Sequence, residues 1–106
     1  MDVRKRKRLE AAGFAVGSAT EFLGLPAADA ALLEMRLALS AALRERRTAA
    51  GLTQAALARR VGSSQSRVAK MEAGDPSVSL ELLIRALLAA GASRRDVARA
   101  LARRVA

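Results

Sequence analysis

Residues 51–74 constrain the fold more strongly than any other segment of the chain. Within it, two stretches with apolar residues at helical spacing are separated by Gly62, and a hydroxyl residue, Thr53 or Ser64, precedes each stretch. A Thr or Ser side chain at a helix N-terminus accepts a hydrogen bond from a free backbone N–H, and glycine tolerates the tight turn between helices. We therefore expect two short helices joined by this turn, at residues 54–61 and 65–73.

The rest of the chain is also expected to be helical. Alanine and leucine dominate its composition, β-branched residues are few, and the only aromatic residues are two phenylalanines. Alanine and leucine favour helices, whereas strands are rich in β-branched and aromatic residues. The predicted fold class is all-α: a five-helix domain at residues 26–106, preceded by a short basic and helical extension at residues 1–25.

A long helix should open this domain, over residues 26–50. Pro26 fits its first turn, where a missing N–H costs nothing, and Gly51 is expected to end it in a left-handed conformation. Apolar residues at helical spacing should mark its inward face: Leu32, Met35, Leu39 and Leu43.

Two further helices should follow. Ser79 is expected to cap a helix that ends at Gly91, and Ser93 with Asp96 forms a capping box that opens the last helix. Apolar stripes should face the core on both: Leu80, Leu83, Ile84, Leu87 and Leu88 on the first, Val97, Leu101 and Val105 on the second.

The extension carries weaker signals. Residues 1–12 could form a helix that ends at Gly13, and the capping box Ser18–Glu21 predicts one helical turn that stops at Gly24. The basic run at residues 4–8 could be a DNA-contacting arm, a solubilising tail or a protein interface, so we assign no site residue to it.

The composition argues against several classes of function. Cysteine and histidine are absent, which removes disulfides, thiolate metal sites and the commonest catalytic base. We therefore expect no enzyme, no metal and no cofactor. Apolar runs such as Leu82–Ile84 are far too short to cross a bilayer, and the basic N-terminus lacks the apolar stretch of a signal peptide. A cytoplasmic location is expected.

The charge of the chain favours nucleic acid as a partner. The formal net charge is +9, and most of the 19 basic residues are arginines. A basic surface gains affinity for phosphates by releasing their counterions. A GC-rich genome would also favour arginine over lysine, but it does not explain the excess of basic over acidic residues.

The segment Leu52–Ala58, followed by Val61–Ser66, resembles the helix-turn-helix of the Cro/CI (XRE) family of bacterial and phage repressors. In similar proteins, a glutamate at the end of the second helix pairs with an arginine four residues before the glycine that ends the preceding helix. The resemblance therefore implies a structural ion pair between Arg47 and Glu72.

The resemblance also implies a DNA-contacting face. Gln65, Ser66 and Lys70 would lie on the exposed side of the second, recognition helix and reach base edges in the major groove. The DNA backbone contacts would come from Gln54, Ser64 and Arg67. The alternative is that these side chains are ordinary solvated residues of two surface helices.

The whole layout resembles antitoxins of the HigA type, on the segments Lys7–Phe14 and Asp75–Leu83. This resemblance implies a repressor of its own operon, which also neutralises a small RelE/HigB-like toxin, an mRNA endonuclease. A stand-alone XRE regulator and a helical protein-interaction module remain alternatives.

One recognition helix covers only a few base pairs, so we expect a homodimer on a palindromic operator. The candidate interface is the apolar face of the last two helices: Leu87, Leu88, Leu101 and Val105. Alternatively, these residues are all internal core.

Overall fold

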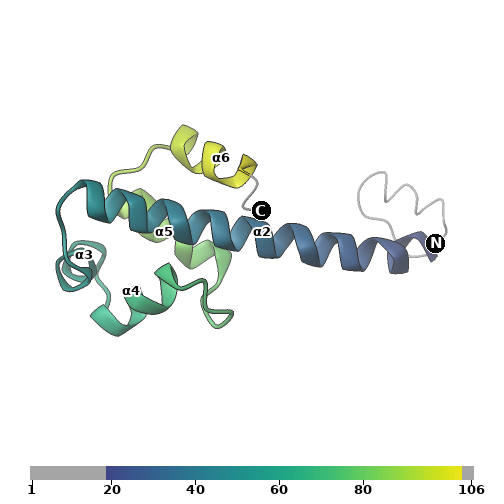
Figure 1. Cartoon of the computed structure of the whole chain (residues 1–106), viewed down its shortest axis with the longest axis horizontal. Helices are drawn as coiled ribbons and strands as arrows, with labels where there is room; N and C mark the ends of the chain where they lie inside the picture. Colours follow the sequence, from purple (N-terminus) through teal and green to yellow (C-terminus); the bar gives the residue numbers. More distant parts are fainter. Residues whose placement is uncertain (1–18, 104–106) are drawn as a thin grey trace. The chain divides into compact units, whose positions relative to one another are not determined.

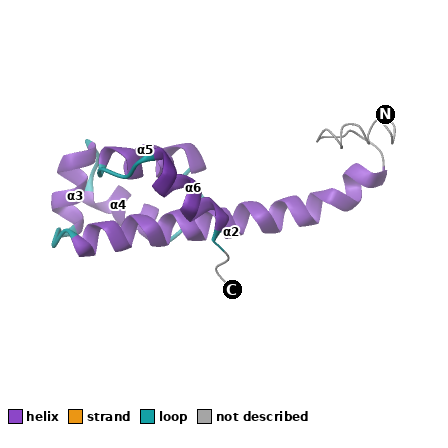
Figure 2. Cartoon of the chain, turned by 90° about the horizontal axis from the view of Figure 1, so that it is seen from above, coloured by secondary structure: helices purple, strands orange, loops and turns teal. Residues whose placement is uncertain are grey.

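A computed structural model describes residues 19–103, with side chains from Pro26 onward. Its helices are α2 (Ala19–Ala49), α3 (Gln54–Val61), α4 (Gln65–Glu72), α5 (Leu80–Ala89) and α6 (Arg94–Ala102) (Figure 1). The described residues form only helices and the loops between them (Figure 2). The all-α prediction with five helices is therefore confirmed. The helix predicted at residues 1–12, the basic run at residues 4–8 and Val105 lie outside the described residues.

Helix α2 begins earlier than predicted. It runs without interruption from Ala19, through Gly24 and Pro26, to Ala49. The prediction of one helical turn that stops at Gly24 and a new helix that begins at Pro26 is wrong. Glycine and proline each weaken a helix locally, but strong helix formers on both sides let the helix propagate across them.

The chain divides into two compact units, and the boundary lies inside α2, between Leu33 and Glu34. In the first unit, Leu32 is 49% exposed and Leu33 is 54% exposed. The prediction that Leu32 lies on a buried face is therefore wrong. Helical spacing identifies the apolar side of a helix, but it does not show how far along the helix the core extends.

The second unit contains the core, to which every helix from α2 to α6 contributes. From α2, Leu39 and Leu43 are fully buried, whereas Met35 is half-buried. The other large buried side chains are Leu57 from α3, Val68 and Met71 from α4, Val78 from the loop after α4, Leu83 and Leu87 from α5, and Val97 from α6.

Two predictions about α5 need correction. Leu88 was expected to face the core, but it is 44% exposed. Leu87 was placed in a candidate dimer interface, but it is only 2% exposed and packs inside the domain. The predicted stripe was wider than the surface that α5 buries against its neighbours.

The helix boundaries in this unit follow the predicted caps. Each of four hydroxyl residues accepts a hydrogen bond from the backbone N–H three residues later, at 3.0 or 3.1 Å: Thr53, Ser64, Ser79 and Ser93. Gly51 and Gly62 adopt the left-handed conformation, with φ of 73° and 71°. The predicted starts of α3 to α6 are confirmed, and α4 ends at Glu72, one residue earlier than expected.

The capping box of α6 is confirmed, because the Asp96 carboxylate accepts the backbone N–H of Ser93 at 2.9 Å. This bond, with help from Arg99 and Arg46, lowers the pKa of Asp96 below its ordinary value. The carboxylate of Asp96 also joins α6 to α2, since Arg46 lies 3.1 Å from it.

The loop between α4 and α5 is held by side chains at both ends. Arg36 of α2 donates hydrogen bonds to the carbonyl oxygens of Asp75 and Val78. The Asp75 carboxylate accepts the backbone N–H of Ser77 at 2.8 Å, which lowers the pKa of that carboxyl. Helix α4 therefore leads into a fixed turn.

Ser40 offers a route to a more stable domain. It is 3% exposed, and its hydroxyl has no hydrogen-bond partner among the described residues. Burying an unsatisfied hydroxyl costs about 1–3 kcal/mol, and alanine also favours the helix. We expect Ser40→Ala to raise the free energy of unfolding by about 1 kcal/mol in urea denaturation. Ser66→Ala, at an exposed helical serine, should change it by only a few tenths. A Ser40→Ala protein no more stable than the parent would contradict this reasoning.

Candidate nucleic-acid interface

Helices α3 and α4 form a packed pair joined by the turn at Gly62. One side of each helix is buried: Leu57 and Ala58 on α3, Val68 and Met71 on α4. The cap at Ser64 fixes where α4 starts, because its hydroxyl accepts the backbone N–H of Arg67 at 3.1 Å. The opposite side of α4 is therefore left to solvent.

The exposed side of α4 carries the residues that the sequence assigned to base contacts. Gln65, Ser66 and Lys70 are all exposed. Arg67 is exposed as well, and it makes no ion pair with any residue of the described chain. The Ser64 and Ser66 hydroxyls lie 3.4 Å apart. Small polar and basic side chains therefore cluster at the start of this helix, and Lys70 follows in its last turn.

Gln54 and Gln65, each the first residue of its helix, are joined by a hydrogen bond. The Nε2 of Gln65 donates to Oε1 of Gln54 at 2.8 Å. The Nε2 of Gln54 in turn donates to Oε1 of Glu72 at 3.1 Å. Gln54 is half-buried, so its amide links the exposed Gln65 to a carboxylate inside the domain. This chain of bonds orients Gln65 before any ligand is present.

Glu72 and Arg47 form a two-point ion pair. The Nε of Arg47 lies 2.6 Å from Oε2 of Glu72, and its Nη2 lies 3.0 Å from Oε1. The Arg47 and Glu72 side chains are only 14% and 4% exposed. A third nitrogen of Arg47 donates to the carbonyl oxygen of Leu52 at 2.9 Å. The hydrogen bond to Glu72 raises the pKa of Arg47 above its ordinary value. The pair therefore ties α2 to both the end of α4 and the loop before α3.

Sequence reasoning missed several of the contacts described above. The Gln54–Gln65 bond depends on the angle at which α3 and α4 pack, and the Arg36 bonds depend on where the loop after α4 crosses α2. The available signal for the first was the presence of a glutamine at the first position of both helices.

Other kinds of site find little support in the described part of the chain. Among residues 19–103, no group of three or more acidic, cysteine or histidine side chains could hold a metal ion. In the same stretch, no helix combines the length and the apolarity that a membrane crossing would require.

Two helices joined by a glycine turn, with a polar and basic face on the second, are the arrangement of a helix-turn-helix, with which many proteins bind DNA. A family model described as helix-turn-helix matches residues 43–97, more than half of the chain. The chain belongs to this family, whose XRE type agrees with the Cro/CI resemblance. Neither a curated protein nor a solved structure shows a match. The chain is therefore a DNA-binding regulator of the XRE type.

Proposed function

We propose that this regulator is a sequence-specific transcriptional repressor that reads the major groove with α4. The observation that best supports this proposal is the orientation of the Gln65 amide. One N–H of Gln65 is bound to Gln54, which leaves its Oε1 and its second N–H for a base edge. An acceptor beside a donor complements the N6 amino group and N7 of adenine. Ser66 and Lys70 would contact neighbouring base pairs on the same face.

The DNA backbone contacts of this proposal come from Gln54, Ser64 and Arg67. Gln54 stands at the N-terminus of α3, where its remaining N–H and the free backbone N–H groups can donate to a phosphate. Arg67 is exposed and without an ion pair in the described chain, so its guanidinium is available to phosphate. The formal net charge of +9 adds a general attraction to DNA.

A homodimer would place two copies of α4 in successive major grooves, with half-sites about 34–36 Å apart. Of the residues named for its interface, Leu88 is exposed and Leu101 is half-buried, so these two remain candidates. A repressor of this type would work in the cytoplasm, where bacterial DNA lies.

Selection of binding sites from a random pool of duplex DNA tests the proposal. The full chain should enrich an inverted repeat and bind it as two chains per duplex, measured by light scattering of the complex. Affinity for this repeat should fall steeply as salt rises. Equal affinity for every duplex, or a single chain on each selected site, would contradict a dimeric sequence-specific repressor.

We further propose that the protein is an antitoxin for a small RelE/HigB-like toxin, and that residues 1–40 supply much of the contact. The support is that residues before 43 lie outside the family match. This segment also contains more large apolar residues than a solubilising tail would need: Leu9, Phe14, Val16, Phe22 and Leu23.

Co-expression with the neighbouring small reading frame tests this role. Co-purification and rescue of growth by the full chain, but not by a chain that begins near residue 26, would support it. Rescue of growth by both chains would place the toxin contact on the helices after residue 26 instead. If neither chain forms a complex with the product of the neighbouring gene, the stand-alone XRE regulator is favoured. If the protein also fails to bind DNA, the helical protein-interaction module is favoured.

A further inference from the structure

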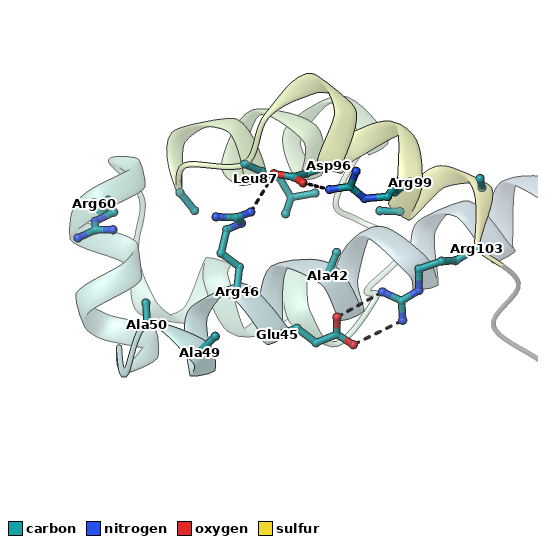
Figure 3. A pocket seen from close by; sticks show the side chains of 14 residues that line it. Ala42, Glu45, Arg46, Ala49, Ala50, Arg60, Leu87, Asp96, Arg99 and Arg103 are labelled. Carbon is teal, nitrogen blue, oxygen red and sulfur yellow. Dashed lines mark hydrogen bonds and ion pairs between the residues drawn. The ribbon is translucent and has the colours of Figure 1, made fainter.

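A groove of about 950 Å³ lies between the C-terminal part of α2 and α6 (Figure 3). Half of the residues that line it are alanines, and the buried Leu87 also lines it. Alanine side chains are too short to fill the space between the helices. Ion pairs join this part of α2 to α6 and to Arg103 directly after it.

The groove carries more positive than negative charge. Its arginines are Arg46, Arg60, Arg99 and Arg103, and its carboxylates are Glu45 and Asp96. Asp96 is shared by Arg46, at 3.1 Å, and Arg99, whereas Glu45 lies 3.3 Å from Arg103. Arg60 makes no ion pair within the described chain. The walls therefore have an excess of two positive charges.

These charges are spread along the groove. Figure 3 shows Arg60 at one end, Arg46 near the middle, and Arg103 at the other end. A small anion would need donors that converge on one point. A row of separated guanidinium groups instead suits a ligand with several carboxylates along its length.

We propose that this groove binds an acidic amphipathic helix of a partner protein. The apolar side of that helix lies on the alanines, and short side chains let two helix backbones approach closely. Its carboxylates pair with Arg60 and compete for the arginines that already hold Glu45 and Asp96. No residue of α4 lines the groove, so it is distinct from the DNA-reading face.

A labelled synthetic peptide of roughly 16 residues, helical and with acidic and apolar faces, serves as the probe. Its binding to the full chain is measured by fluorescence anisotropy. Arg60→Glu should weaken binding about five- to tenfold, because it removes the unpaired cation and adds a repulsive charge. Ala49→Leu should weaken it by a similar factor, because it fills an exposed part of the groove.

Arg59→Glu is the matched control, because it makes the same change in net charge on an exposed neighbour outside the groove. It should change affinity by less than about twofold. Equal losses of peptide affinity in the Arg59 and Arg60 variants would mean that the peptide is held only by the general positive charge of the protein, and would overturn the proposal. No binding by the parent chain would also overturn it. The proposal would also be overturned if Arg60→Glu and Ala49→Leu weakened the binding of duplex DNA but did not weaken the binding of the peptide.

Discussion

Arg47→Met is expected to lower the free energy of unfolding by about 3–5 kcal/mol. The substitution leaves the Glu72 carboxylate, 4% exposed, with only the Gln54 amide as a partner. A buried charge without its counter-ion loses the attraction that offset its desolvation. Leu52 also loses the donor to its carbonyl oxygen.

Urea denaturation of a double-mutant cycle isolates the cause. Glu72→Met should be strongly destabilising as well, whereas the double variant should be much closer to the parent, because it buries no unpaired charge. Arg85→Met is the control, since Arg85 pairs with Glu81 on the surface and both side chains are 73% exposed. That control should cost less than about 1 kcal/mol. Two single losses that simply add in the double variant would contradict a buried pair.

Gln65→Ala is expected to cost about 1–3 kcal/mol at one base pair of the operator, a loss of roughly five- to 150-fold in affinity for the preferred sequence. The reason is that alanine cannot offer the acceptor and donor that the oriented amide presents. Affinity for random duplex DNA should barely change, so the variant should discriminate less between the operator and random DNA. Competition binding with single-base operator variants measures it.

Arg67→Ala is the comparison for Gln65→Ala. A phosphate contact carries no sequence information, so this variant should weaken binding to every duplex alike and reduce the salt slope by about one. If Gln65→Ala left specific and random binding equally unchanged, α4 would not be reading bases at this position. If Arg67→Ala changed only the preferred sequence, the assignment of Arg67 to the DNA backbone would be wrong.

The sequence was sufficient wherever structure depends on a few neighbouring residues. Thr53 and Ser64 mark the starts of α3 and α4, and Gly51 marks the end of α2, because caps and left-handed turns involve only adjacent backbone groups. The exposed residues of the candidate site could be predicted for the same reason, because the start of α4 fixes which of its side chains face solvent.

Features that depend on packing could not be predicted in the same way. Leu87 and Leu88 are neighbours of similar apolarity, but only the path of the other helices decides that one is buried and the other exposed. The bond between Gln54 and Gln65 likewise requires the packing angle of α3 and α4. Pro26 shows the reverse case, in which a strong local signal for a helix start yields to a longer helix around it.

The way α6 is attached has a consequence for local unfolding. This helix buries two side chains, Val97 and Ala100, and half-buries Leu101. Ion pairs between partly exposed side chains join α2 to Asp96 of α6 and to Arg103 directly after it. Detaching it exposes little apolar surface, and salt screens the charges that hold it. We therefore expect the opening of α6 to require less free energy than global unfolding. Native-state hydrogen exchange should show its amide protons exchanging with solvent before those of α4. We therefore expect α3 and α4 to stay folded while the C-terminal helix opens and closes.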